Sequence, residues 1–462
     1  MTATAPGSPT GAAPGSDPIG ETAPRIDDVV DATPATGRSL EHNSMALAVS
    51  ALVTGVVGLA YWAIVGRLYP ASEVGAASAV ITTATMLSAF GNLSIGALFE
   101  RFLPLAGIRS KSMVCTGFLV GAGFGTALGA GFLFWGPIEE MFHGRLDAAL
   151  FPAVVAVLSA FALLDHTSVG LREAGWAATK NVAHSVVKLA AVVLFAYTAS
   201  RLAIVWTWIL PAAVAVVLLG LRVGQRLRHQ ESRADGSDLP PRRELGEFLV
   251  GAYGIYVVGA LAPLVLPLIV IDRLGADANA YFAITWSLVT SVVVLLAMLM
   301  GPYVAAAAAD ADRTWQLTLR FLAILGLVAT GGVMLFALIG PVLLRIVGPE
   351  YADAGTPLLH WAALALVPAV VSFAYNAVAR VQRRLRLAVT VQVVNAAIVL
   401  GASWVLIGDH GLVALGKAYV VAESVSAVLL VVPLVLALIR MRRDAQRSVN
   451  WIADSVGANS PS

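Results

Sequence analysis

The chain is poor in charge and holds a single cysteine. Only 13% of its 462 residues are charged, 58% are hydrophobic, and the mean hydropathy is +0.81. This composition excludes a soluble protein of such a size. Because Cys115 is the only cysteine, the sequence predicts neither a disulfide framework nor a thiolate metal cluster.

Sequence patterns of enzyme chemistry are lacking as well. The chain has no metal-ligand cluster, no nucleophile elbow and no phosphate-binding loop. The run GAGFG at 121–125 lies inside an apolar stretch, without the strand–loop–helix context of a nucleotide motif. We therefore expect no catalytic residue, no metal and no cofactor.

Twelve apolar stretches of membrane-spanning length divide the chain. Each has about the 20 residues that a helix needs to cross a hydrocarbon core of about 30 Å. They lie at about 44–66, 74–98, 113–135, 150–170, 182–200, 202–221, 248–271, 280–303, 317–341, 358–379, 387–407 and 418–439. The sequence thus predicts an all-α polytopic membrane protein of about 12 transmembrane helices.

The basic residues are distributed unequally between the connections of these stretches. If the N-terminus is cytoplasmic, 23 of the 30 Lys and Arg residues fall on the cytoplasmic side and 6 on the opposite side. Such an excess in short loops follows the positive-inside rule and predicts that both termini are cytoplasmic. We expect a bacterial-type plasma membrane as the location. The net charge of +2 then reflects topology and indicates no nucleic-acid partner.

The polar segments predict five parts. Residues 1–43 are rich in Pro, Gly, Ala, Thr and Ser, contain no core of a cleavable signal peptide, and predict a disordered cytoplasmic tail. The polar, proline-broken segment 222–247 predicts a cytoplasmic linker. It separates an N-terminal six-helix lobe at 44–221 from a C-terminal six-helix lobe at 248–440. Residues 441–462 predict a second cytoplasmic tail.

Polar side chains inside the apolar stretches are the candidates for function, because charge in the hydrocarbon core is costly. Around the fifth stretch, Asn181, His184 and Lys188 recur at helical spacing on one face. Asp165 and Arg172 form a matching stripe on the fourth stretch. Pairing of Asp165 with Lys188 or with His184 would tie the two helices together. Alternatively, the basic side chains form a cationic wall for an anionic head group.

Further polar groups lie in other stretches. Glu423 is expected to find a partner on another helix or to line a watery cavity, and it is a candidate coupling or protonation site together with Asp165. Ser88 and Asn92 share one face of the second stretch and are cavity candidates, while Asn395 lies in the eleventh stretch.

Prolines and glycines predict two features of packing and motion. Pro263 and Pro267 each remove a helix hydrogen bond from the seventh stretch, and a kink there would suit a gate. The third stretch carries small residues four apart, which allow close approach of another helix. These residues are Gly117, Gly121, Gly125 and Gly129.

Five segments carry a family resemblance through their order and spacing. They are GRLYPASEVGAASAV (66–80), ERFLP (100–104), LREAGWAATKN (171–181), LLRIVGPEYADAGTPLLHWAALALVPAV (343–370) and NAVARVQRRLR (376–386). Together they resemble the polysaccharide and oligosaccharide flippases of the multidrug/oligosaccharidyl-lipid/polysaccharide (MOP) superfamily. The resemblance covers about 44–440.

The resemblance implies two six-helix lobes around a central cavity and transport by alternating access. The substrate would be a polyprenyl-(pyro)phosphate-linked oligosaccharide, moved to the outer leaflet for cell-surface polysaccharide biosynthesis. Implied partners are this lipid-linked glycan, membrane lipid, and polysaccharide polymerases and glycosyltransferases. Lipid II flippases typically have charged residues that line the cavity from their first two helices. Cation-coupled drug exporters often have an acidic residue in the first helix. Here the first stretch has no charged residue before Arg67, at its exit. This difference disfavours lipid II and cation-coupled drug export.

Other classes agree less well with the sequence. A major-facilitator carrier would usually have a Gly-x-x-x-Asp-Arg-x-Gly-Arg-Lys-like loop after the second stretch, where this chain reads ALFERFLPLAGIRSKS (97–112). A glycosyltransferase or ligase would need sizeable exterior loops, and the longest here, 136–149, is short. The alternatives are a small-solute or drug exporter of the same superfamily and, less favoured, a membrane glycosyltransferase or ligase.

Overall fold

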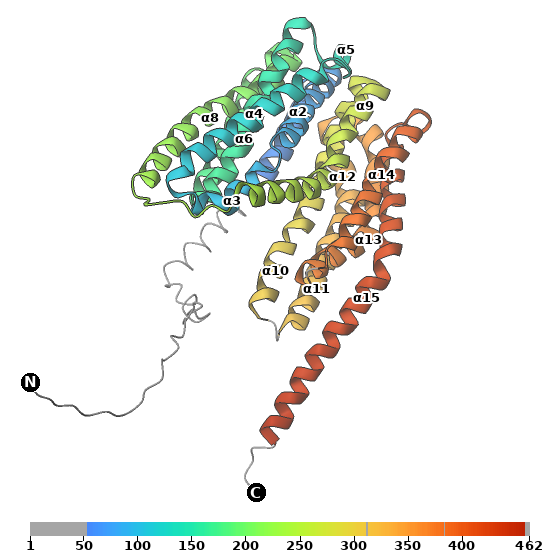
Figure 1. The fold of residues 1–462 in the computed structure, drawn as a ribbon. Helices are drawn as coiled ribbons and strands as arrows, with labels where there is room; N and C mark the ends of the chain where they lie inside the picture. Colours follow the sequence, from blue (N-terminus) through green and yellow to red (C-terminus); the bar gives the residue numbers. More distant parts are fainter. Residues whose placement is uncertain (1–52, 311–312, 383, 458–462) are drawn as a thin grey trace, which may run out of the picture. The chain divides into compact units, whose positions relative to one another are not determined.

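The computed structural model describes residues 53–310, 313–382 and 384–457, and every regular element in these ranges is a helix (Figure 1). The predicted tail at 1–43, the start of the first apolar stretch and residues 458–462 lie outside these ranges. The long apolar helices confirm the prediction of an all-α polytopic membrane protein.

The helices follow one another through short connections. The first described helix covers Val53–Leu68. It is followed by α2 (Ala71–Gly91), α3 (Ile95–Phe102), η2 (Leu103–Leu105), η3 (Gly107–Arg109), α4 (Ser110–Phe132), α5 (Ile138–Met141), α6 (Arg145–Gly170), α7 (Ala174–Leu194), η4 (Ala196–Thr198) and α8 (Arg201–Glu231). The second half contains α9 (Arg242–Met298), α10 (Met300–Ala309), α11 (Thr314–Met334), the π-helical turn η5 (Leu335–Ile339), α12 (Gly340–Val347), α13 (Pro349–Val381), α14 (Arg386–His410) and α15 (Val413–Gly457).

Ten helical segments of the described residues are long and apolar enough to cross a membrane. One of them, Leu261–Ala307, has 47 residues, about twice the length of a single crossing. Gly275 divides it, with φ 83° and ψ −179° inside α9, so this segment supplies the seventh and eighth predicted spans. Together with the Val53–Leu68 helix, the described residues contain all or part of each of the twelve predicted spans.

The second predicted span is not one continuous helix. α2 ends at Gly91 and α3 begins at Ile95, because Leu93 and Ser94 take left-handed backbone conformations with φ of 47° and 57°. Such a conformation costs a residue with a side chain about 1–2 kcal/mol, so the surrounding packing must stabilise the break. The expectation of an unbroken helix over 74–98 is therefore wrong here.

α4 packs closely against α2 and α6 through its glycine face. All four predicted glycines of this face are buried, which confirms the packing predicted from their spacing. A methyl group added to Gly125 would lie 2.6 Å from Oγ of Ser159 on α6. Gly123, on another face of the same helix, has no atom within 4 Å of such a methyl group.

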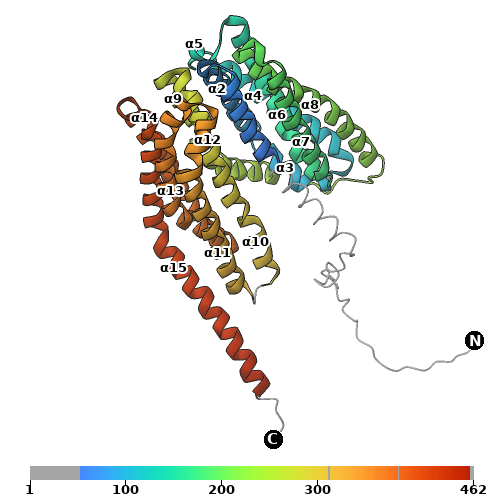
Figure 2. The same cartoon turned by 180° about the vertical axis from the view of Figure 1, so that it is seen from behind.

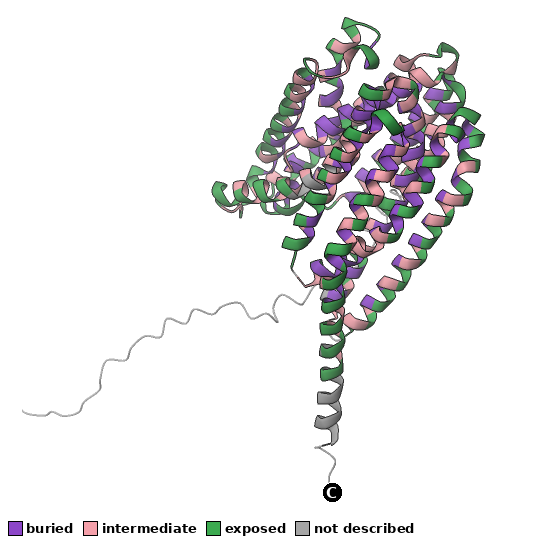
Figure 3. Cartoon of the chain, turned by 90° about the vertical axis from the view of Figure 1, so that its right-hand side faces the viewer, coloured by how far each residue is buried: buried purple, intermediate pink, exposed green. Residues whose placement is uncertain are grey.

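Large apolar side chains cover the outward faces of the helices. Leu119, Leu327, Val405 and Val428 are each 71–76% exposed. Figure 3 shows exposed residues along the outer sides of the helices and buried residues between them. Apolar surface of this extent is typical of helices that face lipid.

The helices form two bundles that we define by their packing. The N-terminal bundle comprises residues 53–231 and the C-terminal bundle residues 250–440; Figures 1 and 2 show the helices of each lying side by side. The start of α9 packs against the N-terminal bundle, where the ring of Phe248 lies 5.3 Å from that of Phe102.

Between the two bundles, the predicted linker 222–247 is partly helical. α8 continues to Glu231 and α9 begins at Arg242, and the helix breakers Gly236, Pro240 and Pro241 lie between them.

The two bundles contact each other along α2 and α9. The Asn279 side chain on α9 donates a hydrogen bond to the backbone oxygen of Gly75 at 2.8 Å and lies 3.4 Å from Oγ of Ser78. A methyl group on Gly75 would lie 1.7 Å from the carbonyl oxygen of Ala276. This backbone approach therefore requires glycine at position 75.

Candidate functional sites in the two bundles

A lysine is buried among aromatic rings in the N-terminal bundle. Lys188 on α7 is 5% exposed, and its Nζ lies 3.3 Å from the ring centroid of Trp208 on α8 and 5.1 Å from that of Tyr61. The rings of Tyr61, Trp62 and Trp208 form an aromatic cluster, with ring centroids 5.1–5.9 Å apart. A desolvated ammonium over an aromatic face is stabilised by about 2 kcal/mol. Within the described residues, Lys188 makes no ion pair.

Lys180, two turns earlier on α7, has a carboxylate partner. Its Nζ lies 2.9 Å from Oδ1 of Asp165, and Asn181 donates to Oδ2 of the same carboxylate at 3.2 Å. The predicted pairing of Asp165 with Lys188 or with His184 is therefore wrong. The reason is the register of the α6–α7 hairpin, whose short turn places Asp165 level with Lys180. Residues 184 and 188 lie one and two turns farther from that turn.

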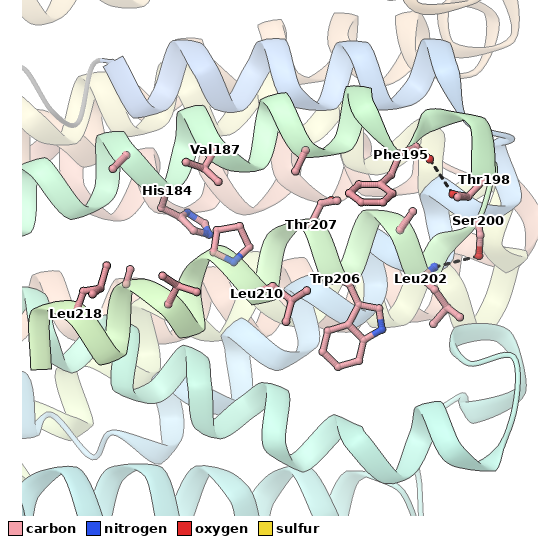
Figure 4. Close-up of a pocket in the computed structure, with 16 residues that line it drawn as sticks. His184, Val187, Phe195, Thr198, Ser200, Leu202, Trp206, Thr207, Leu210 and Leu218 are labelled. Carbon is pink, nitrogen blue, oxygen red and sulfur yellow. Dashed lines mark hydrogen bonds between the residues drawn. The ribbon is translucent and has the colours of Figure 1, made fainter.

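His184 lies between the Lys188 site and an apolar groove. Its Nε2 lies 3.0 Å from the backbone oxygen of Trp208. The same side chain lines a groove of about 770 Å³ between α7 and α8, whose walls are almost entirely apolar (Figure 4). Val187 and Leu210, one from each helix, are about half exposed in this groove. The groove is thus open on the outer side of the bundle and suits a hydrocarbon chain.

The remaining polar candidates of this bundle lie elsewhere. Ser88 is buried and bonds to its own helix, while Nδ2 of buried Asn92 lies 3.4 Å from the backbone oxygen of Ser159 on α6. Arg172 is exposed at the turn between α6 and α7, with φ 61°. No hydrogen bond, ion pair or ring contact in the described chain joins these three candidates to Lys188.

The C-terminal bundle encloses a cavity of about 210 Å³ with one carboxylate in its wall. Glu423 on α15 accepts hydrogen bonds from Oγ of Ser372 on α13 and from Nδ2 of Asn395 on α14, each at 3.1 Å. The Asn395 amide also lies 3.0 Å from Oγ of Ser426. Of the two expectations for Glu423, a partner on another helix or a watery cavity, the first is confirmed by Ser372 and Asn395.

Aromatic and amide side chains complete the wall of this cavity. Trp286, Gln392 and Tyr419 line it, and the rings of Trp286 and Tyr419 lie 4.9 Å apart. Nε1 of Trp286 is buried without a hydrogen-bond acceptor among the described residues. Glu423 makes no ion pair in the same ranges. Oxygen atoms of this kind can bind a proton or a small hard cation.

The two prolines predicted as a gate lie on α9 near this cavity. Pro263 lines the cavity and Pro267 is buried. The helix continues through both, and within described α9 the backbone leaves the helical region only at Gly275. The φ of 83° at Gly275 is one that residues with a side chain rarely adopt. The gating role of the prolines stays a prediction.

Sequence reasoning missed the aromatic residues around Lys188. Trp208 and Tyr61 lie on other helices, and aromatic residues in spans are common as interfacial anchors, so their partner could not be recognised. The one available signal was the Tyr61–Trp62 pair, which lies about one helical turn before the end of the first apolar stretch.

No protein-family model matches the sequence, and no curated protein matches it. Among solved structures, the chain is similar to an inward-facing multidrug resistance MATE family transporter of the MOP superfamily. The TM-score is 0.61 and the identity 14%, over 87% of this chain and 99% of that one. It is also similar to the lipid II flippase MurJ in an inward closed conformation, with a TM-score of 0.61 and 10% identity over 90% of this chain and 93% of that one. For an outward-facing multidrug resistance MATE family transporter, the TM-score is 0.58 and the identity 13%, over 87% and 96% of the two chains.

These similarities establish the fold. The chain has the fold of MOP-superfamily membrane transporters, as the resemblance of its sequence segments implied. The structures it resembles are transporters and a flippase, and at 10–14% identity they indicate architecture rather than substrate.

Proposed function

We propose that this protein is a MOP-type transporter that moves a polyprenyl-(pyro)phosphate-linked oligosaccharide from the inner to the outer leaflet by alternating access. Both termini would be cytoplasmic, and the glycan would serve cell-surface polysaccharide biosynthesis beside its polymerase and glycosyltransferases. The observation that carries the proposal is the buried ammonium of Lys188, which has aromatic neighbours and no ion pair in the described chain.

The chemistry of this lysine suits a phosphate group. Burial of a charge without a partner is costly, and the rings of Trp208 and Tyr61 offset only part of that cost. A phosphate oxygen can accept charge-assisted hydrogen bonds from the ammonium. Lys180 adds little, since Asp165 already balances its charge.

The aromatic cluster suits the sugar that follows the phosphate. The rings of Trp62 and Trp208 are partly exposed and offer apolar faces beside the buried ring of Tyr61, while the Trp N–H groups are polar. A sugar ring likewise has apolar C–H faces and hydroxyl edges. A site that contains both kinds of surface can therefore hold it in a defined orientation.

The groove between α7 and α8 suits the polyprenyl chain. It is apolar, has a volume of about 770 Å³, and His184 connects it to the Lys188 site. A hydrocarbon chain in this groove would stay in contact with lipid while the head group moves. Only the polar head then needs a path shielded from the hydrocarbon core.

The C-terminal bundle would supply the coupling step. Glu423 lines a cavity with Asn395 and Tyr419, and it has no basic partner in the described chain. Binding of a proton or cation there would change the net charge of the cavity and bias the bundle between two conformations.

The α2–α9 contact would be the part of the transporter that opens and closes. Gly75 and Asn279 hold the two bundles together in this conformation, and alternating access requires such a contact to separate in another. Gly275 lies close to this contact in the chain. Pro263 and Pro267, which precede Gly275 on α9, are the candidate gating residues.

The second candidate is export of an aromatic drug by the same fold. The Tyr61–Trp62–Trp208 cluster would also stack on a planar organic molecule. The ammonium of Lys188, however, would repel the cationic drugs that prefer such aromatic sites. An anionic head group therefore agrees better with the charge of this site.

The test is head-group translocation in proteoliposomes that contain the purified full-length protein. One set of vesicles holds a polyprenyl-pyrophosphate sugar, and a matched set holds a fluorescent cationic dye in its lumen. We expect protein-dependent exposure of the sugar in the first set and no protein-dependent dye transport in the second. Dye transport without sugar exposure, across a panel of lipid-linked sugars, would replace the flippase with the drug exporter.

A further inference from the structure

A second pocket of the N-terminal bundle is lined by basic side chains and lies apart from the Lys188 site. It has a volume of about 480 Å³ and lies where the α6–α7 turn, the end of α8 and the η2–η3 segment meet. Arg172, Arg226, His229 and Arg233 contribute its charged and titratable side chains. No acidic residue is among the lining residues.

The arginines of this pocket are only partly balanced by carboxylates. Arg226 lies 3.7 Å from Oε1 of Glu173, and its side chain is 43% exposed. Neither Arg172 nor Arg233 makes an ion pair within the described ranges. Because a guanidinium is always charged and presents its donors in a rigid fork, the pocket is preorganised for an oxyanion.

Backbone hydrogen bonds hold the walls of the pocket in place. On one side, the amide of Ile108 donates to the oxygen of Gly236 at 3.1 Å, and the amide of Asp238 donates to the oxygen of Leu105 at 3.0 Å. On the other side, Arg172 keeps a left-handed backbone with φ 61°. This conformation closes the capping turn that ends α6, in which the amide of Glu173 donates to the oxygen of Ser168 at 2.8 Å. The concave shape therefore does not depend on flexible side chains alone.

The pocket lies at the depth of lipid head groups. α8 begins at Arg201, and Arg226 follows 25 residues later, roughly 38 Å along the helix axis at about 1.5 Å per residue. This length exceeds a hydrocarbon core of about 30 Å. The pocket therefore lies just outside the core, on the side where the sequence concentrates its basic residues and where anionic head groups attract them.

From this geometry we infer that the pocket binds the phosphate of a membrane lipid head group, at a site distinct from the Lys188 and Glu423 sites. The arginines contact the phosphate oxygens, and the lipid chains stay in the adjacent leaflet. The phosphate can belong to a phospholipid or to a polyprenyl phosphate, which share this chemistry. The inference does not rest on the proposed transport substrate.

The test measures lipid binding to the purified full-length protein in a neutral detergent. The probes are phosphatidylglycerol, a polyprenyl phosphate, diacylglycerol as a lipid without phosphate, and inorganic phosphate. The pocket variant is Arg172→Gln/Arg226→Gln/Arg233→Gln. Its matched control, Arg222→Gln/Arg228→Gln/Arg243→Gln, removes the same charge from residues of the same region that do not line the pocket.

We expect the wild-type protein and the matched control to bind at least one of the two phosphate lipids with similar affinity, and not diacylglycerol. The pocket variant should bind it at least about tenfold more weakly, since one charge-assisted hydrogen bond corresponds to about that factor. Whichever phosphate lipid binds more tightly identifies the source. Ala234→Glu, which keeps all three arginines but adds a carboxylate to the pocket wall, should weaken binding similarly.

Three results would overturn the inference. Equal weakening in the pocket variant and the matched control would mean that only the overall charge matters. Unchanged binding in both the pocket variant and Ala234→Glu, with melting temperatures that show folded proteins, would place the lipid elsewhere. Displacement of the lipid by inorganic phosphate at the same concentration would identify a soluble ligand instead.

Discussion

The two bundles each contain a buried or half-buried group, and the two groups are opposite in charge. In the N-terminal bundle, the ammonium of Lys188 lies against aromatic rings and has no ion pair in the described chain. In the C-terminal bundle, the carboxylate of Glu423 accepts hydrogen bonds from Ser372 and Asn395. Among the described residues, the ammonium of Lys188 has no hydrogen-bond or ion-pair partner, and this site is suited to an incoming anion. The carboxylate of Glu423 already has neutral hydrogen-bond donors, and this site is suited to the gain or loss of a proton or cation.

The difference predicts a division of labour between the bundles. A buried charge with only aromatic neighbours gains most when an oppositely charged ligand arrives. A carboxylate that neutral donors already satisfy can be held in the fold in both of its charge states. We therefore expect the N-terminal bundle to recognise substrate and the C-terminal bundle to respond to ions, and each bundle can be tested separately.

The largest effect should come from Lys188→Ala. Loss of the ammonium should lower head-group translocation about 10- to 100-fold, because charge-assisted hydrogen bonds contribute about 1.5–3 kcal/mol each. Lys188→Arg should retain part of the activity. The matched control is Lys417→Ala, which removes a lysine that lies 5.9 Å from the Trp361 ring in the other bundle. Undiminished translocation by correctly inserted Lys188→Ala would remove this residue from the substrate site.

The next effect concerns coupling. Glu423→Gln keeps the size of the side chain and removes its charge, so we expect transport driven by an imposed proton or sodium gradient to fall about tenfold, within the usual range of coupling free energies. Transport without a gradient should change less. Glu244→Gln, an exposed residue at the start of α9, is the control. An identical gradient dependence in Glu423→Gln and the wild type would contradict a coupling role.

A smaller effect is expected at the contact between the bundles. Gly75→Ala would place a methyl group 1.7 Å from the carbonyl oxygen of Ala276, so the closed contact should become less populated. A clash worth about 1 kcal/mol already shifts the population about fivefold. The measurement is the maleimide labelling rate of Ser78→Cys, a position buried at this contact, in a Cys115→Ser background.

The control for this experiment is Gly58→Ala on the first helix, where an added methyl group meets no atom within 4 Å. Its labelling rate should equal that of the parent. Equal labelling in the Gly75→Ala protein would show that α2 and α9 do not need to approach this closely.

The sequence predicted the membrane helices well because their physical requirement is local. A helix in hydrocarbon needs about 20 apolar residues between polar ends, and both features are visible in the chain. The glycine face of α4 was predictable for the same reason, since spacing of four residues defines a face of any helix. The break at Leu93 and Ser94 was not, because neither residue type favours the left-handed backbone that it adopts.

The candidate sites were predictable only in part. The sequence identified Lys188, His184, Asp165 and Glu423 because polar groups in apolar spans are conspicuous. The partner of Asp165 depends on the register between the two helices of a hairpin. If the turn between them is misplaced by a few residues, the residue that faces Asp165 changes by a full helical turn. The aromatic partners of Lys188 come from distant helices, and only tertiary packing brings them together.

The smallest predicted effect compares how the two bundles pack. On α2 in the N-terminal bundle, a methyl group on Gly91 would lie 2.5 Å from the Cα of Gly125 on α4. In the C-terminal bundle, a methyl group on Gly332 would lie 2.6 Å from a methyl carbon of Val292. Backbone atoms cannot move aside without shifting a helix, whereas side-chain ends can change rotamer. Overpacking typically lowers the free energy of unfolding by about 1–3 kcal/mol. We therefore expect a loss near the upper end of this range for Gly91→Ala and near the lower end for Gly332→Ala.

Thermal unfolding followed by tryptophan fluorescence should rank the proteins accordingly. We expect Gly123→Ala, whose methyl group meets nothing within 4 Å, to equal or exceed the wild type, because alanine favours a helix more than glycine does. Gly332→Ala should unfold at a lower temperature and Gly91→Ala at the lowest. If Gly332→Ala unfolds first, the N-terminal bundle is the more adaptable of the two. Rigid support of the substrate site would then have to come from the aromatic cluster rather than from the helix backbones.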